Sequence, residues 1–202
     1  MNNIKAVLFD MDGVLIDSFE AWFHVFNGAL ANFNFKTVTK KEFIKNCWAI
    51  DSSIIIPKYF PEIDINEVAD YYQENFLEFD KHIKILPNVE QTLKKLKEKK
   101  IKTAVVTNTY HEQAEETLKK IKLHKYFNTF ACADDVEVGK PEPDIIFKAL
   151  KDLNIEKENA IFIGDTKTDI SAGKNAEIFT IGLNVNGGNK KIKDLKELMQ
   201  FL

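Results

Sequence analysis

The sequence predicts an α/β protein whose core is a doubly wound, mostly parallel sheet, with an inserted α-helical cap domain. Helical patterns separate short apolar runs, which recur at residues 6–9, 103–106, 160–163 and 178–181. Continuous apolar runs of this length are typical of strands buried on both faces. Strands that alternate with helices favour a parallel sheet with helices on both sides.

Between these runs, three local signals predict helix starts. Pro87 can occupy the first turn of a helix. Thr109 followed by Glu112 has the pattern of a capping box, and Pro143 with Asp144 predicts a further start. The segments that follow carry apolar side chains at helical spacing, so each helix is expected to pack one face on the sheet.

Residues 18–82 differ from the rest of the chain. They are rich in aromatic side chains and helical spacing, and they lack comparable buried-strand runs. Thr39 and Asp64 are candidate N-caps within this segment. We therefore expect a catalytic core at residues 1–17 and 83–202 and a helical cap at residues 18–82.

The composition indicates a protein that acts on small ligands. The 202 residues carry a formal net charge of -3 and include no arginine. This offers no broad basic surface for nucleic acid or anionic lipid, and no apolar stretch is long enough to span a membrane. The start of the sequence has no signal-peptide pattern, so we expect a cytoplasmic protein, either a monomer or a homodimer. Without arginine, an anionic ligand must be held by lysine, hydroxyls, backbone N–H groups or a metal ion.

The two cysteines, Cys47 and Cys132, lie far apart in the sequence and form no C-x-x-C pair. Their spacing predicts neither a disulfide framework nor a zinc site. We expect two reduced thiols that are partly buried.

An acidic pair follows the first apolar run. Asp10 and Asp12 would lie at the carboxyl end of that strand, where ligands bind in parallel sheets. Alternate residues of an extended chain point the same way, so both carboxylates can face one pocket. Gly13 permits a tight turn close to a ligand. Isolated pairs of this kind are also common in surface turns, so the prediction depends on the other segments.

A second acidic pair, Asp165 and Asp169, follows the run at residues 160–163. If a helix begins directly after Asp165, both carboxylates lie on one face and point to the same sheet edge as Asp10. Two carboxylates about 4 Å apart repel by roughly 4 kcal/mol at an effective dielectric constant near 20, so a cluster of such groups requires a cation. Oxygen ligands without histidine or cysteine favour Mg²⁺ over zinc.

Two other segments suit an anion. Thr107 and Asn108 end the run at residues 103–106 and place a hydroxyl and a backbone N–H at an expected helix start. Lys140 lies in a loop at residues 139–143 that two prolines stiffen. Together with the acidic pairs, these residues predict a phosphate site.

In chain order, the four segments resemble the signature of the haloacid dehalogenase superfamily, namely D-x-D-G-x-L, T-N, G-K-P-x-P-D and G-D-x-x-x-D. The resemblance covers residues 4–183. Residues 18–82 are similar to the helical cap of phosphoglycolate phosphatase-like and beta-phosphoglucomutase-like members. The resemblance implies a Rossmann-like core and a Mg²⁺-dependent phosphatase whose substrate is a small-molecule phosphate ester.

The resemblance also implies roles for the site residues. Asp10 would attack phosphorus and form an aspartyl-phosphate, which splits a slow hydrolysis into two easier transfers. Asp12 would act first as general acid and then as general base. Thr107, Asn108 and Lys140 would hold the transferring oxygens. The Mg²⁺ ligands would be the Asp10 carboxylate, the Asp12 main-chain carbonyl, Asp165 and Asp169, the last directly or through water.

Other activities fit parts of the pattern. A dehalogenase would lack the second acid and use a cap arginine, whereas this chain has Asp12 and no arginine. A phosphosugar mutase of the same superfamily is the closer alternative, but Trp22 stands where mutase-like caps carry a histidine, and His24 is offset. A phosphoaspartate signalling module or a non-catalytic phosphate-binding module belongs to a different class, and repeated release of phosphate would exclude both.

Some features leave the substrate open. Residues 48–53 lie where related caps reach the substrate, so they could contact the leaving group or simply form a loop or a helix start. Glu177 stands where related sequences usually have glycine, which predicts an altered turn. The cap shows no recognisable specificity pattern, so phosphoglycolate, sugar phosphates and nucleotides all stay candidates.

Overall fold

A computed structural model describes residues 3–48, 50 and 52–202 of the chain. The described residues form two compact units, one that runs up to Asp17 and resumes at Ile85–Leu202, and another at Ser18–Lys84. In the described part of the chain, no helix is long and apolar enough to cross a membrane.

The first unit is built on a six-stranded sheet in the order β5-β4-β1-β6-β7-β8. Every neighbouring pair in this sheet is parallel. The chain leaves the central strand toward one edge and later returns to build the other, so the sheet is doubly wound as predicted. The strands are β1 (Ala6–Phe9), β4 (Lys102–Val106), β5 (Thr129–Ala131), β6 (Ala160–Gly164), β7 (Phe179–Leu183) and β8 (Lys190–Ile192).

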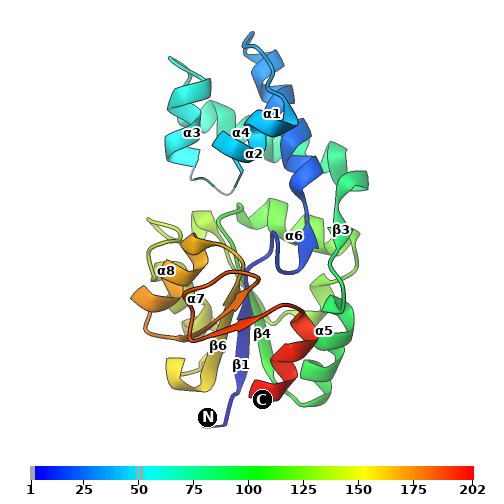
Figure 1. Cartoon of the computed structure of the whole chain (residues 1–202), viewed down its shortest axis with the longest axis vertical. Helices are drawn as coiled ribbons and strands as arrows, with labels where there is room; N and C mark the ends of the chain where they lie inside the picture. Colours follow the sequence, from blue (N-terminus) through cyan, green and yellow to red (C-terminus); the bar gives the residue numbers. More distant parts are fainter. Residues whose placement is uncertain (1–2, 49, 51) are drawn as a thin grey trace. The chain divides into compact units, whose positions relative to one another are not determined.

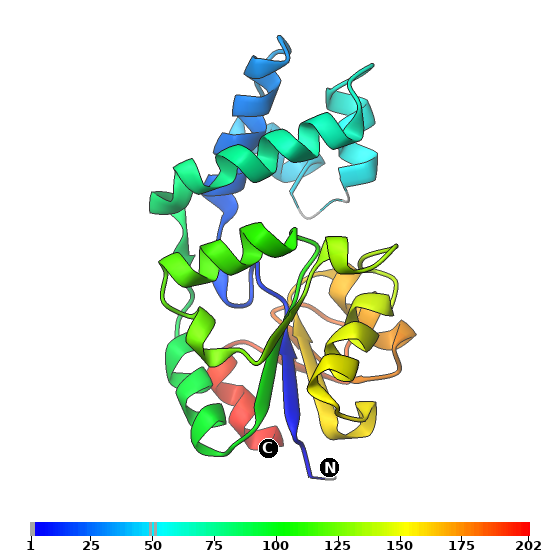
Figure 2. The ribbon, with the colours of Figure 1, turned by 180° about the vertical axis from the view of Figure 1, so that it is seen from behind.

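Helices cover both faces of this sheet (Figures 1 and 2). Helices α7 and α8 lie on one face, and α5 packs with the C-terminal η5 on the other. The helical segments of this unit are α5 (Val89–Glu98), α6 (His111–Lys120), η2 (His124–Tyr126), η3 (Ala133–Asp135), α7 (Asp144–Leu153), η4 (Lys157–Asn159), α8 (Lys167–Asn175) and η5 (Leu195–Phe201).

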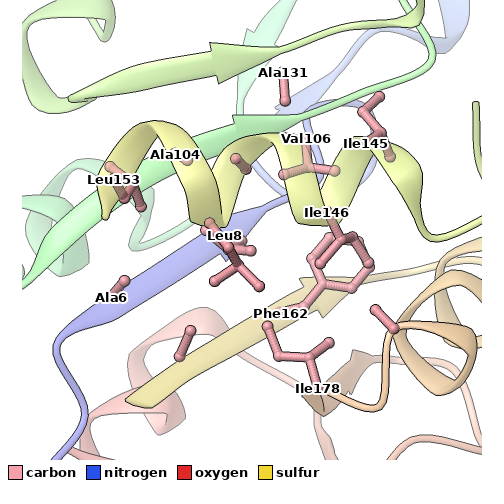
Figure 3. Packing of buried hydrophobic residues seen from close by; sticks show 14 of the residues in the cluster. Ala6, Leu8, Ala104, Val106, Ala131, Ile145, Ile146, Leu153, Phe162 and Ile178 are labelled. Carbon is pink, nitrogen blue, oxygen red and sulfur yellow. The ribbon is translucent and has the colours of Figure 1, made fainter. Parts of the chain in front are cut away.

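The core on the α7 face explains why the central strands are apolar throughout. Leu8 of β1 and Phe162 of β6 are fully buried beside Ile146 of α7. Helix α7 contacts β5, β4 and β1, and Figure 3 shows it packed on this face of the sheet. Alternate strand residues such as Val7 are equally buried on the opposite face. Burial on both faces removes the polar alternation that a solvent-facing strand would show.

The second unit is helical. Its elements are α1 (Phe19–Asn32), α2 (Lys40–Asn46), α3 (Ser52–Tyr59), α4 (Ile65–Asn75) and η1 (Phe76–His82). Phe26, Phe43 and Phe60 are buried at its centre, and other aromatic side chains pack around them. A short two-stranded sheet of β2 (Ile16–Asp17) and β3 (Lys84–Ile85) marks the two crossings between the units. The role of residues 18–82 as a cap stays a prediction.

Most of the predicted helix starts are confirmed. Thr39 caps α2 by accepting a hydrogen bond from the Glu42 N–H, and Asp64 caps α4 in the same way. Helix α7 begins at Asp144 directly after Pro143.

Two helix-start predictions need correction. The capping box at Thr109 is wrong, because α6 begins at His111 and its N-cap, Tyr110, makes no side-chain capping bond. Helix α5 begins two residues beyond Pro87, since Asn88 adopts a left-handed conformation with φ 61° ahead of Val89. Of residues 48–53, the two at positions 49 and 51 lie outside the described residues.

Candidate active site

The site residues meet because three strands end side by side. The register aligns Phe9 of β1 with Val105 of β4 and with Ile163 of β6. The residues that follow these positions therefore emerge at one edge of the sheet. Asp10 continues the hydrogen-bonded pairing of β1 with β6 by one residue, since its N–H donates to the Ile163 carbonyl at 2.9 Å.

Lys140 lies at the centre of the site. Its ammonium Nζ is 2.5 Å from Asp10 Oδ1 and 2.7 Å from Asp169 Oδ1, and it also donates to the Val106 carbonyl at 3.1 Å. The three charged residues are almost completely buried. A buried ion cluster of this kind is held in place by charge-assisted hydrogen bonds.

Asn108 fixes the loop that carries this lysine. Its side-chain Nδ2 donates to the Lys140 carbonyl at 2.8 Å, and its Oδ1 accepts from the Lys140 N–H at 2.8 Å. The amide of Asn108 is therefore engaged with the protein main chain. Its own backbone N–H is the group that stays a candidate for binding an anion.

Asp169 lies in the first turn of a helix that begins at Lys167 and not directly after Asp165. Helix α8 begins at Lys167 with Thr166 as its N-cap, and Asp169 closes a capping box with that threonine. Its Oδ2 accepts from the Thr166 N–H at 3.0 Å and from the Thr166 hydroxyl at 2.5 Å. Both carboxylate oxygens of Asp169 thus have hydrogen-bond donors within the protein.

Asp12 and Asp165 complete the acidic cluster, and two further residues position them. The Thr109 hydroxyl donates to Asp12 Oδ2 at 3.4 Å. Gly13 adopts φ +83°, and a Cβ added there would lie 2.1 Å from Asp165 Oδ2. A larger residue at position 13 would therefore displace the Asp165 carboxylate, in addition to the strain of a left-handed backbone.

Sequence reasoning missed Thr109 as a site residue and assigned it to a helix cap. The only signal in the sequence was its place, two residues beyond Thr107 and close behind the expected strand end. The Thr107 hydroxyl is buried and accepts from the Thr109 N–H at 3.2 Å. Both threonines thus belong to the turn that follows β4.

The pKa shifts follow from burial and crowding of like charge. Burial raises the pKa of Asp10 well above its usual range, and Asp169 adds to this, while Lys140 opposes it. Burial together with Asp169 raises the pKa of Asp165 to about 7. Burial alone would raise the pKa of Asp169, but the charge and hydrogen bond of Lys140 outweigh it and hold that pKa below its usual range.

These groups fit a hard divalent cation. Carboxylate oxygens of Asp10, Asp165 and Asp169 lie within 4.8 Å of one another. Asp165 Oδ1 is buried and has no hydrogen-bond partner among the described residues, which is costly unless a ligand satisfies it. One lysine cannot neutralise this cluster, and carboxylate oxygens are the ligands that Mg²⁺ or Ca²⁺ prefers.

The doubly wound sheet, with buried carboxylates gathered beyond its central strands, is typical of α/β proteins that bind a ligand at the carboxyl edge of the sheet. Over residues 7–183 the sequence matches the haloacid dehalogenase-like hydrolase family, and the chain belongs to this family. The predicted family resemblance and the predicted fold class are both confirmed.

Individual relatives agree with this assignment. The chain is 33% identical to a pyrophosphatase, PpaX, of Halalkalibacterium halodurans, with 91% of this chain and 86% of the relative covered. It is 29% identical to a phosphorylated carbohydrates phosphatase of Thermotoga maritima, with 87% and 82% covered. The crystal structure of CbbY from Rhodobacter sphaeroides in complex with phosphate superposes with a TM-score of 0.85 at 22% identity, covering 96% of each chain.

Proposed function

We propose that this hydrolase is a Mg²⁺-dependent phosphatase that cleaves small-molecule phosphate monoesters through an aspartyl-phosphate on Asp10. The observation that carries the proposal is the meeting of Asp10, Asp165 and Asp169 within 4.8 Å at the carboxyl edge of the sheet. The phosphatase names of the curated relatives support the same reaction class.

Asp10 is the proposed nucleophile because it is buried and held in a fixed orientation. Lys140 contacts its Oδ1, and its backbone N–H is part of the sheet. A carboxylate that is held in line with phosphorus converts a bimolecular attack into an intramolecular one. The phosphorus–oxygen bond to the leaving alcohol breaks as the bond from Asp10 to phosphorus forms, and water later hydrolyses the acyl phosphate.

Asp12 is the proposed general acid and base. It lies two residues beyond the nucleophile and close enough for its charge to raise the pKa of Asp10, and the Thr109 hydroxyl orients its Oδ2. In the first step Asp12 would give a proton to the leaving oxygen. In the second it would take a proton from the attacking water, which restores the starting state.

The phosphoryl oxygens need donors that are already in place. We assign this role to the Thr107 hydroxyl, the Asn108 backbone N–H and the Lys140 ammonium, which lie around the same edge of the sheet. Such donors stabilise charge on the transferring group without reorganisation during the reaction.

Asp10, Asp165 and the main-chain carbonyl of Asp12 are the proposed Mg²⁺ ligands. Asp169 is proposed to act through water, because Lys140 and Thr166 already occupy both of its carboxylate oxygens. When bound, Mg²⁺ would neutralise the acidic cluster and the charge of the incoming phosphate. Lys140, which is itself held by Asp169, would keep the Asp10 carboxylate in place with or without the ion.

The proposal is tested by measuring phosphate release from a panel of substrates. The panel contains sugar phosphates, phosphoglycolate, nucleotides and pyrophosphate, each assayed with Mg²⁺ and with a chelator. We expect repeated turnover of at least one compound with Mg²⁺ and none with the chelator. A mutase would instead isomerise a sugar phosphate without net release of phosphate.

The Asp10→Asn variant tests the nucleophile, because the change removes the charge without changing the volume of the side chain. It should fold normally and lose turnover, and mass spectrometry of rapidly quenched protein should find a phosphorylated Asp10 peptide only in the unmodified enzyme. The control variant is Asp152→Asn, which makes the same chemical change at an acidic residue on the surface of α7. This variant should keep full activity. Metal-dependent turnover by Asp10→Asn would refute this assignment.

A further inference from the structure

We propose that His111, Cys132 and Asp135 form a second cation site that binds a soft divalent metal such as Zn²⁺. One ligand atom from each of the three residues lies within 4.8 Å of the others. His111 Nδ1 and Asp135 Oδ2 are 3.0 Å apart. Two ligands of one tetrahedral ion are separated by about 3.3–3.6 Å when each lies about 2.0–2.2 Å from the metal, so this pair needs to open by only a few tenths of an ångström.

The fold holds the three ligands in place from two neighbouring strand ends. His111 is the first residue of α6, and its backbone N–H donates to Asp134 Oδ1 at 2.8 Å. Cys132 follows β5, and its N–H donates to Asp135 Oδ2 at 2.8 Å. These bonds tie the start of α6 to η3, so the ligands are organised before any ion binds. This preorganisation lowers the entropic cost of binding.

The ligand set selects a different metal from the one expected in the acidic cluster. A thiolate and an imidazole favour zinc and related transition metals, whereas clusters of carboxylates alone favour Mg²⁺ or Ca²⁺. The second ring nitrogen of His111 faces Glu115, with Nε2 at 3.8 Å from Oε1. A carboxylate at this position is the usual partner that orients a metal-binding histidine.

Charge and accessibility also suit a cation. The carboxylates of Asp134, Asp135 and Glu115 lie near enough to the Cys132 thiol to act on it electrostatically, and this acidic setting attracts a cation. Binding through sulfur would release the thiol proton to solvent as the metal–sulfur bond forms. The side chain of His111 is 39% exposed, so an ion can reach the site from its side.

The sequence predicted no zinc site, because the two cysteines lie far apart and form no C-x-x-C pair. Here the ligands come from the end of one strand and the start of a helix that follows another strand. Only the parallel pairing of β4 with β5 brings these segments together.

Cobalt binding provides the test, because a cobalt–thiolate bond gives a charge-transfer absorption band that carboxylate ligands do not give. Co²⁺ is titrated into the whole protein in the presence of excess Mg²⁺, which occupies the acidic cluster. We expect one equivalent of Co²⁺ to bind with a thiolate band, and stoichiometric Zn²⁺ to abolish that band.

Variants identify the ligands. Cys132→Ala and His111→Gln should each remove the band, whereas Cys47→Ala, which changes the other buried thiol, and Asp10→Asn should leave it unchanged. Circular dichroism checks that each variant is folded. If the wild-type protein shows no thiolate band, or if Cys132→Ala binds Co²⁺ with the same spectrum, the proposed site does not exist.

Discussion

Lys140 Nζ lies 2.5 Å from Asp10 Oδ1, although 130 positions separate the two residues in the chain. The same ammonium is 2.7 Å from Asp169. Burial would lower the pKa of this lysine, but the two carboxylates raise it instead, so Lys140 stays charged. One side chain thus compensates two buried acids and contacts the proposed nucleophile, which makes its removal informative for both stability and chemistry.

Lys140→Met should destabilise the protein strongly at neutral pH. The substitution leaves Asp10 and Asp169 buried without their partner, and breaking a buried ion pair in this way costs about 3–5 kcal/mol. Urea unfolding monitored by circular dichroism measures this loss, and Lys151→Met at an exposed position of α7 serves as the control. If both variants lose the same small amount of stability, the buried cluster does not depend on Lys140.

The metal-free protein should become less stable as the pH rises from about 5 to about 8. Burial and Asp169 raise the pKa of Asp165 to about 7 in the folded state, above the value of about 3.9 for an unfolded aspartate. The folded state therefore binds more protons than the unfolded state between these values, and this contribution to stability is lost as the pH passes the folded pKa.

Thermal unfolding with a chelator across this pH range measures the effect, and Asp165→Asn should flatten the dependence. Added Mg²⁺ should raise the unfolding temperature more at about pH 8 than at about pH 5, because protons compete with the ion for the carboxylates. A stabilisation by Mg²⁺ that does not change with pH would contradict the proposed ligands.

Gly13→Ala should impair Mg²⁺ binding more than folding. The added Cβ would lie 2.1 Å from Asp165 Oδ2, and position 13 has φ +83°, which alanine adopts only with strain. A displacement of about 1 Å at a catalytic site can reduce the rate about a hundredfold. Calorimetric titration with Mg²⁺ and measurement of kcat test this prediction, and unchanged binding would show that Asp165 adjusts without loss.

Glu177→Gly should stabilise the protein slightly. Glu177 has φ 54°, a left-handed conformation that costs a non-glycine residue about 1–2 kcal/mol. Two effects reduce this benefit. The substitution removes an exposed ion pair with Lys157 that contributes about 0–1 kcal/mol, and glycine increases the conformational entropy of the unfolded state. The net increase in the free energy of unfolding should therefore be below about 1 kcal/mol.

Glu177→Ala is the matched control, because it removes the same ion pair and keeps the strained backbone. Alanine should therefore give no gain in unfolding temperature, while glycine should raise it. An equal effect of the two substitutions would show that the backbone conformation at this turn carries no cost.

The sequence predicted the sheet and the positions of the acidic residues because both depend on local patterns. Continuous apolar runs identified β1, β4, β6 and β7, and the carboxyl ends of parallel strands must meet at one edge. The edge strand β8, Lys190–Ile192, was missed, since a short strand with exposed lysines carries no buried run.

Side-chain partners could not be predicted in the same way. The predicted role of Asn108 rested on its backbone N–H and did not include its side-chain amide, which holds the Lys140 main chain. Thr109 contacts Asp12 instead of capping α6. Both interactions join segments that are distant in sequence. They depend on rotamers and loop geometry that a single sequence does not specify.

The central place of β1 also affects the order of folding. Its two neighbours, β4 and β6, end at Val106 and Gly164, so β1 leaves the ribosome long before both strands that pair with it have been synthesised. Contacts between segments so distant in sequence slow folding and leave apolar strands exposed for longer. We therefore expect nascent chains that end before residue 160 to need protection from aggregation, even though they already contain Asp10.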